Sequence, residues 1–277
     1  MKQNNRAGDA GNPFSRRTLV KRIGIAGAAG AALLGLPRGL DAQTLTDVDI
    51  VNFALNLEYL EAEFYTVATT GKTIEQLGIG VDGTGTAGPT TGGSAVNAFD
   101  NTLFSNQVAL QIAADERAHV TYLRNALKSM GQQPVAKPAI NLGALGIGFA
   151  NSMEFLTLAR AFEDVGVTAY GGAAPLIQDT AVLGIAARIF AAENEHAANI
   201  RLQIAALGIT TSALDKLDVL PPPAGMKFFS VDSSGLVQVR TPGQVLYIVY
   251  GNQADSAAGG FFPNGVNGTI RMSSAQA

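Results

Sequence analysis

The chain has no cysteine among its 277 residues and only two histidines. The missing thiols exclude disulfide bonds, thiolate metal ligands and cysteine-based catalysis. Any metal ion bound by this chain must therefore be held by oxygen and nitrogen atoms. Both histidines follow a glutamate by three residues, since Glu116 precedes His119 and Glu193 precedes His196.

The two E-x-x-H motifs predict a metal site. On a helix, residues three apart lie on the same face, so each motif presents a carboxylate and an imidazole side by side. Di-metal carboxylate sites in four-helix bundles use this chelating pair twice. Both motifs lie in segments rich in Ala, Ile and Leu, where a buried unpaired carboxylate would be costly. We therefore interpret them as metal ligands rather than as surface Glu–His pairs.

The N-terminal segment, residues 1–42, has the features of an export signal. Residues 15–21 (SRRTLVK) resemble the twin-arginine box, and an apolar stretch, residues 23–36, follows. This stretch is short for a transmembrane helix, which needs roughly 20 residues. Cleavage is predicted after Ala42, which leaves a periplasmic or extracellular protein without a stable membrane anchor.

Positive charge is scarce in the rest of the chain. The signal holds 7 of the 19 basic and 2 of the 22 acidic residues, which leaves 12 against 20 and a net charge of −8. An acidic surface without a basic patch argues against nucleic acid as a partner. The same surface would tolerate or attract cations.

Four long helices are predicted after the signal, from apolar residues at helical spacing and from capping signals. They cover residues 46–69, 94–130, 151–170 and 179–207. Thr46 and Asp49 form a capping box at the start of the first helix. Glycines follow the ends of the other three, which is typical of helix C-termini.

The connections between these helices have a short–long–short order. Residues 78–94 are rich in Gly and Thr and are predicted to form a flexible loop. Gly78–Gly83 matches G-x-G-x-x-G, but no strand precedes it and no helix starts at it, so we reject a dinucleotide site. Residues 131–150 are long enough to span a bundle lengthwise. One long crossover between the second and third helices is typical of one class of four-helix bundle.

The last part of the chain, residues 209–277, is predicted to be a separate appendage. Residues 226–231 and 236–240 flank a turn sequence and predict a small β-hairpin. A short helix is predicted from Pro242 to Tyr250, with proline at the first helical position. This region has no cluster of metal-ligand residues, so we interpret it as a packing element or a partner surface.

The two halves of the predicted bundle look like internal repeats. Aligning Glu58 with Glu163 places Tyr65 on Tyr170, and the two E-x-x-H motifs align with each other. Such pseudo-two-fold symmetry is what a dinuclear centre needs, because each half supplies one side of the cage. Four carboxylates and two imidazoles would offset the charge of two divalent cations and leave positions open for water, dioxygen or peroxide.

These residues resemble the ferritin-like di-iron carboxylate superfamily, and the whole is similar to twin-arginine-exported ferritin-like domain proteins related to desiccation-associated proteins. The superfamily pattern is Glu, E-x-x-H, Glu, E-x-x-H on four successive helices. It covers roughly residues 46–208, within a bundle domain of residues 43–208. The resemblance implies a mainly α fold, a ferritin-like four-helix bundle with a long crossover between helices two and three and a small C-terminal α+β appendage. The implied metal ligands are Glu58, Glu116, His119, Glu163, Glu193 and His196.

The resemblance also implies two iron ions, with manganese as the alternative, and residues that support the ligands. Tyr65 and Tyr170 match tyrosines that bond within the site in bacterioferritin-like relatives. Asp115 matches an aspartate that orients a ligand histidine in some relatives. Its counterpart in the second motif is Ala192, so the two metal positions are expected to be unequal.

The glutamate supplied by the first helix has an alternative. Glu61 lies nearer the centre of the apolar stripe, about 60° from Glu58 on the helical wheel. The internal repeat favours Glu58, because the counterpart of Glu61 is Gly166. Other charged residues of the bundle are predicted to be solvated or to form ion pairs, namely Glu63, Glu195, Arg124 and Arg201.

The expected function is an exported ferritin-like protein with a di-metal site that reacts with peroxide or dioxygen, or oxidises Fe(II), in stress defence. A di-manganese enzyme of catalase type would use the same ligands. A non-enzymatic desiccation- or stress-protective protein is the alternative of another class. Dioxygen or peroxide is the expected small-molecule partner, and a monomer or homodimer is expected rather than a storage shell.

Overall fold

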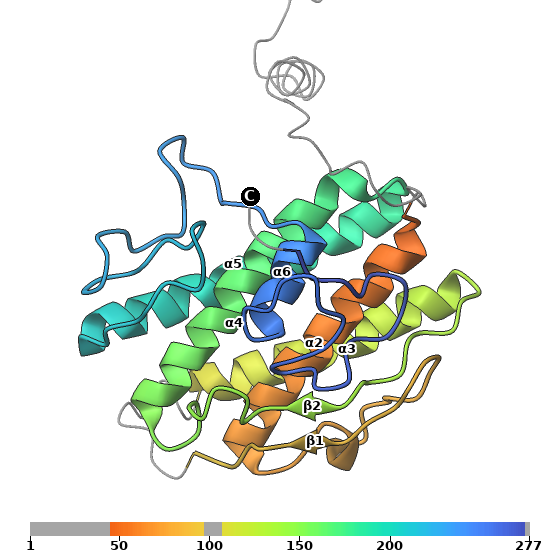
Figure 1. Cartoon of the computed structure of the whole chain (residues 1–277), viewed down its shortest axis with the longest axis horizontal. Helices are drawn as coiled ribbons and strands as arrows, with labels where there is room; N and C mark the ends of the chain where they lie inside the picture. The colour runs from red at the N-terminus through yellow and green to blue at the C-terminus, as the bar shows by residue number, and fades with distance from the viewer. Residues whose placement is uncertain (1–44, 97–106, 275–277) are drawn as a thin grey trace, which may run out of the picture. The chain divides into compact units, whose positions relative to one another are not determined.

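The computed structural model describes residues 45–96 and 107–274, which are mainly helical (Figure 1). The predicted export signal, residues 1–42, lies outside this part of the chain. So does the stretch 97–106 of the predicted second helix. No helix among the described residues combines the length and the apolar character needed to cross a membrane.

Four long helices form the predicted bundle (Figure 1). They are α2 (Asp47–Thr70), α3 (Ala109–Ser129), α4 (Ser152–Ala173) and α5 (Thr180–Leu207). The main packing partners are α2 with α3 and α4 with α5. A long crossover joins α3 to α4, so the predicted bundle topology is confirmed.

Local capping explains most of the helix ends. The Thr46 side chain accepts a hydrogen bond from the backbone of Asp49, and the Asp49 carboxylate accepts one in return. Asn151 caps α4 and Asp179 caps α5 in the same way, with side-chain oxygens that accept backbone N–H groups. Gly208 ends α5 in the left-handed conformation, with a φ of 66°.

Two helix ends differ from the prediction because tertiary contacts override the local signal. Residues 94–96 are not helical, since the Val96 N–H donates to the Ala68 carbonyl at the end of α2. At the end of α4, the helix continues through Gly171 and Gly172, which the sequence predicts to follow its last residue. A Cβ on Gly172 would lie 2.0 Å from the carbonyl oxygen of Arg240, so the glycine permits close approach of another segment rather than ending the helix.

The connection between α2 and α3 pairs with the crossover between α3 and α4. The strand β1 (Thr90–Thr91) runs parallel to β2 (Ile140–Asn141) in the crossover, and a 3₁₀ turn, η1 (Glu75–Leu77), precedes β1. The loop that was predicted to be flexible is therefore fixed by backbone hydrogen bonds to the crossover. A further parallel bridge joins Thr84 to Val135.

The prediction that Glu63 is solvated is wrong. Its carboxylate is fully buried and lies 2.8 Å from the ammonium of Lys137. The Thr90 hydroxyl and the Ile74 backbone N–H also donate to it. Because Lys137 is distant in the sequence and is itself buried, no local pattern reveals this pair. The buried ion pair ties α2 to the crossover.

The C-terminal residues contain the predicted short helix but not the predicted hairpin. Helix α6 (Pro242–Val249) begins after a capping box at Thr241 and packs on α4. The hairpin is reduced to one antiparallel bridge between Val231 and Val237. Its strands do not extend, because two backbone carbonyls of the first, those of Lys227 and Phe228, accept hydrogen bonds from Arg201 on α5 instead.

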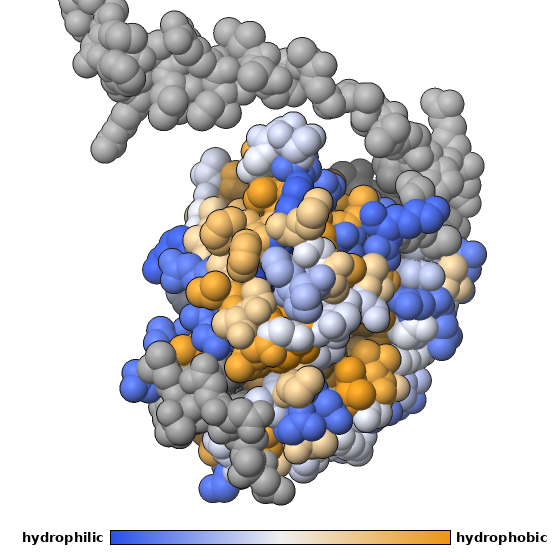
Figure 2. Space-filling view, turned by 90° about the vertical axis from the view of Figure 1, so that its left-hand side faces the viewer, coloured by the Kyte–Doolittle hydropathy of each residue, from blue (hydrophilic) through white to orange (hydrophobic). Residues whose placement is uncertain are grey.

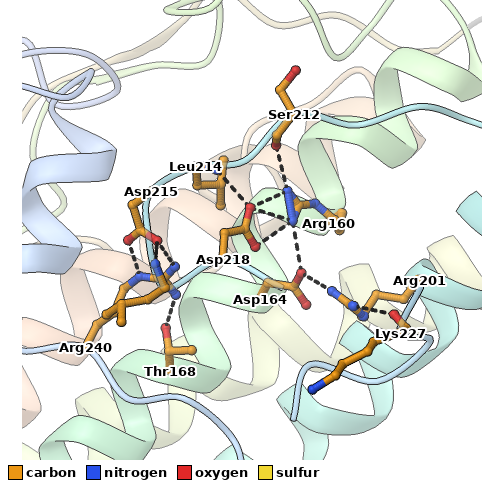
Figure 3. A network of polar contacts seen from close by, with 11 residues as sticks. Arg160, Asp164, Thr168, Arg201, Ser212, Leu214, Asp215, Asp218, Lys227 and Arg240 are labelled. Carbon is orange, nitrogen blue, oxygen red and sulfur yellow. Dashed lines mark hydrogen bonds and ion pairs between the residues drawn. The ribbon is translucent and has the colours of Figure 1, made fainter. Parts of the chain in front are cut away.

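Buried arginines attach the C-terminal region to α4 (Figure 3). Arg160 on α4 donates to both carboxylate oxygens of Asp218, at distances from 2.8 to 2.9 Å. Arg240 pairs with Asp215 and donates to the Thr168 hydroxyl on α4. Charge-assisted forks of this kind fix orientation as well as contact.

The apolar core continues from the bundle into this region. Phe64 and Phe155 stack within the bundle with ring centroids 5.0 Å apart, and Phe162 meets Phe261 of the C-terminal tail edge to face at 5.0 Å. On the face shown in Figure 2, apolar residues lie among polar ones. Residues 209–274 therefore act as a packing element of the bundle.

Candidate metal centre

The four helices bring all six predicted metal ligands together in two overlapping groups. The first group is Glu58, Glu116, His119 and Glu193, and the second is Glu116, Glu163, Glu193 and His196. Within each group, one potential ligand atom per residue lies within 4.8 Å of all the others. Glu116 and Glu193 belong to both groups, so each would serve both ions if the two groups bound one ion each.

The first group converges on one nitrogen of His119. The Nδ1 atom lies 3.3 Å from Glu58 Oε2, 3.4 Å from Glu116 Oε2 and 3.4 Å from Glu193 Oε1. These carboxylates come from three different helices. A single point between them is therefore surrounded by three oxygens and one nitrogen.

The second group is arranged in the same way around His196. Its Nδ1 atom lies 3.0 Å from Glu116 Oε1 and 3.5 Å from Glu163 Oε2. Its other nitrogen, Nε2, lies 3.4 Å from Asp115 Oδ2. Asp115 therefore stands behind His196, across the bundle from its own motif, where it can fix the imidazole orientation. The ion-pair contacts of His119 among the described residues are all with glutamates, so the surroundings of the two imidazoles differ.

The geometry fits metal ions better than hydrogen bonding among the side chains. Two atoms that bind one ion at about 2.1 Å and at right angles lie about 3 Å apart, which is close to the spacings in both groups. Within the described residues, both histidine Nδ1 atoms and most of the carboxylate oxygens are buried without a hydrogen-bond partner. Unpartnered buried polar atoms are costly unless an ion or another ligand compensates them. The residues present therefore fit a pair of metal ions.

Burial and mutual charge shift the carboxyl groups of the cage in opposite directions. Burial raises the pKa of Glu58 to about 7, and burial together with the Glu116 charge raises that of Glu193. Burial acts in the same direction on Glu116, but the imidazoles of His119 and His196 outweigh it and lower its pKa to about 2. Glu116 is thus the most anionic member of the cage.

The histidines respond to the same carboxylates. Burial lowers the pKa of His196, but Glu116 and Glu163 outweigh it and raise the value to about 12. The pKa of His119 is also raised, mainly by Glu58 against the effect of burial. Protons therefore balance the carboxylate charge in the metal-free cage, and metal binding must release them.

The two tyrosines cross between the halves of the bundle. The Tyr170 hydroxyl on α4 donates to Glu58 Oε1 on α2 at 2.5 Å. The Tyr65 hydroxyl on α2 lies beside Glu163 on α4, without a hydrogen bond of good geometry. Burial raises the pKa of both hydroxyls, so both remain protonated donors. Each tyrosine can hold a carboxylate of the opposite half.

Glu61 lies beside the two groups and belongs to neither. Its side chain is buried. Its Oε1 atom and Glu193 Oε2 both lie close to the position that a Cβ on Gly166 would occupy. Burial and the Glu193 charge raise its pKa well above the usual range. Gly166 was not predicted to have a role, although its alignment with Glu61 in the internal repeat was the available signal. The absence of a side chain there makes room for the extra carboxylate.

We predict that Gly166→Ala weakens metal binding. The new Cβ would lie 2.8 Å from Glu193 Oε2 and 3.0 Å from Glu61 Oε1, so the bridging carboxylate must move. A loss of about 10- to 100-fold in affinity is expected, as for other changes that misalign ligands. Competition with a metallochromic chelator measures it.

Gly184→Ala is the matched control, since Gly184 is an exposed glycine of α5 with no atom near the added Cβ. It should leave affinity unchanged and stabilise the helix by up to about 1 kcal/mol. Equal affinities for the two variants would show that Gly166 does not position the carboxylates.

An opening to the surface lies beside His119, between α3 and α5. It is lined by His119, Tyr122 and Arg188 among small and apolar residues. The His119 side chain is 12% exposed, whereas the four cage carboxylates are fully buried. Small polar reagents can therefore approach the first group from this side.

The charged residues outside the cage follow the prediction in part. Arg124 pairs with Asp82 at 2.7 Å and Arg201 with Asp164 at 2.7 Å, so both arginines are ion-pair partners as predicted. Glu195 is exposed, also as predicted.

Comparison with known proteins identifies the family of this chain. The chain is 24% identical over 278 aligned positions to the "Ferritin-like catalase Nec2" of Nesocodon mauritianus, covering 81% of this chain and 84% of the relative. It is 27% identical over 173 positions to the "Desiccation-related protein PCC13-62" of Craterostigma plantagineum, covering 56% of this chain and 52% of that protein. The family model for the ferritin-like domain matches residues 46–206, the whole four-helix bundle. This protein therefore belongs to the ferritin-like domain family.

Proposed function

We propose that this protein is a di-metal oxidoreductase that consumes peroxide, with two iron ions, or manganese ions, in the cage. The observation that carries the proposal is the pair of buried ligand groups that share Glu116 and Glu193 and lack internal hydrogen-bond partners. Four carboxylates offset the charge of two divalent cations. Bound there, such a metal pair supplies the redox chemistry that cleaves an O–O bond.

The residues around the cage have separable tasks in this proposal. Tyr170 contacts Glu58, and Asp115 contacts His196. Each contact limits the movement of a ligand side chain. Arg188 and Tyr122 provide hydrogen-bond donors at the opening beside His119, where a peroxide molecule would arrive. The apolar core around the cage excludes bulk water from its other sides.

The named relatives support two readings of different classes. The relative called a ferritin-like catalase supports peroxide as the substrate. The relative called desiccation-related favours a second candidate function, a stress-protective protein without turnover. Export by residues 1–42 belongs to the proposal in both cases and would place the protein in the periplasm or outside the cell. Size-exclusion chromatography is expected to give a monomer or homodimer.

Metal analysis combined with a peroxide assay tests the proposed function. Protein purified after native export should contain two Fe or Mn ions per chain and should consume hydrogen peroxide. The variant His119→Ala/His196→Ala should lose both the ions and the activity, because each group loses its only nitrogen ligand. A metal-bound protein that turns over no peroxide would favour the protective candidate. A metal-free protein with an intact fold would exclude the oxidoreductase.

A further inference from the structure

A second cavity lies close to the cage and has a different chemistry, although Ile185 lines both it and the opening beside His119. It lies among α2, α3, α4 and α5, and all of its lining residues are apolar or glycine except Glu61 and Tyr170. Its volume is about 40 Å³. Because a single water needs roughly 10 to 15 Å³ of such space, the cavity has room for only a few atoms.

Two lining residues of this cavity contact the first ligand group. Tyr170, which lines the cavity, donates its hydrogen bond to Glu58. Gly166 also lines it. A Cβ at this position would lie 2.8 Å from Glu193 Oε2 and 3.0 Å from Glu61 Oε1. Tyr170 and Gly166 therefore stand between the cavity and two residues of the first group, Glu58 and Glu193.

Glu61 is the carboxylate that lines this cavity. Its side chain is only 5% exposed and lines the cavity, yet it belongs to neither ligand group.

The apolar lining of the cavity determines which small molecule it can hold. Hydrogen peroxide and water would lose most of their hydrogen bonds on entering an apolar cavity, at a cost of roughly 2 to 7 kcal/mol per unpartnered hydroxyl. Enclosed apolar cavities stay dry and bind apolar species such as xenon, and the apolar lining here favours the same kind of guest. Aromatic or acyl groups exceed the available volume. Dioxygen is apolar, is small enough and is a reactant or product of the proposed chemistry, since two molecules of hydrogen peroxide give one of dioxygen and two of water.

We infer that this cavity, with Ala54, Ala173, Ala186 and Glu61 in its wall, is the passage for dioxygen to and from the metal centre. Peroxide uses the polar opening beside His119 instead. The inference rests on the proposed function for its purpose, but the binding of an apolar gas to the cavity does not depend on metal or turnover.

Xenon-pressurised crystals test the cavity directly. Xenon should bind in the cavity of both metal-free and metal-loaded protein. The variant Ala186→Phe should lose the xenon, because the ring fills the space. The matched control is Ala187→Phe, on the exposed side of the same turn of α5, which should keep it. If Ala186→Phe fails to fold, Ala173→Leu narrows the same cavity from α4. An empty wild-type cavity under xenon pressure would overturn the inference.

Stopped-flow kinetics test the passage. In the Fe(II)-loaded protein, Ala186→Phe should slow oxidation by dioxygen on the order of tenfold and leave oxidation by hydrogen peroxide unchanged, while Ala187→Phe should affect neither. An equal effect on both oxidants, or none on dioxygen, would contradict separate routes. If the wild-type protein reacts with neither oxidant, the proposed function fails, and the xenon experiment still decides whether the cavity binds an apolar gas.

Discussion

Glu116→Gln is expected to abolish metal binding at both positions, whereas Glu163→Gln should abolish it at only one. Glu116 belongs to both ligand groups, and its pKa of about 2 makes it the carboxylate that is most fully charged. Glu163 belongs to the second group alone. Removing a charged ligand should weaken binding by on the order of 100-fold or more at each position it serves, at least as much as losing an outer-shell partner.

Metal content by mass spectrometry distinguishes these outcomes. The expected contents are near zero ions per chain for Glu116→Gln, near one for Glu163→Gln and two for Glu195→Gln, in which the same change is made at an exposed glutamate. Glutamine has nearly the shape of glutamate, so circular dichroism should show an unchanged helix content. Retention of two ions by Glu116→Gln would exclude a bridging role for this residue.

Asp164→Asn is expected to destabilise the protein by about 3 to 5 kcal/mol, the usual cost of leaving a buried charge without its partner. Arg201 on α5 donates to Asp164 at 2.7 Å and has no other carboxylate partner among the described residues (Figure 3). Both side chains are almost completely buried. Arg201 also holds the carbonyls of Lys227 and Phe228, so the change loosens the C-terminal region from the bundle.

Urea denaturation measures this effect, and two further variants interpret it. Arg188→Met removes an exposed arginine from the same helix and should change the free energy of unfolding by no more than about 0.5 kcal/mol. In the double variant Asp164→Asn/Arg201→Met, the buried charge is absent, so the loss should be clearly smaller than the sum of the single losses. A loss below about 1 kcal/mol for Asp164→Asn would show that water or another group compensates Arg201.

The helices were predictable because their ends are fixed by neighbouring residues. Thr46, Asn151 and Asp179 each cap a helix through a side chain that reaches no more than three residues ahead. The prediction failed at residues 94–96 and at Gly172, where a distant segment competes for the same backbone. It also failed for the hairpin, since Arg201 captures carbonyl groups that a partner strand would need.

The choice between Glu58 and Glu61 shows what the sequence leaves open. Both residues face inward, and the angle between them on the helical wheel is too small for periodicity to separate them. The structure places Glu58 within the first group and Glu61 in the wall of the apolar cavity. The space that admits Glu61 is created by Gly166 on another helix.

The sequence by itself determined the bundle and the pairing of carboxylate with imidazole, because helix periodicity and E-x-x-H spacing are properties of a single helix. Only the tertiary structure decided which carboxylates are shared between the two groups, which acid lies outside them and where Glu63 and Asp164 find their cations. Those outcomes depend on atoms brought within a few ångströms by helices far apart in the chain. No local pattern encodes such distances, since they arise from the packing of all four helices together.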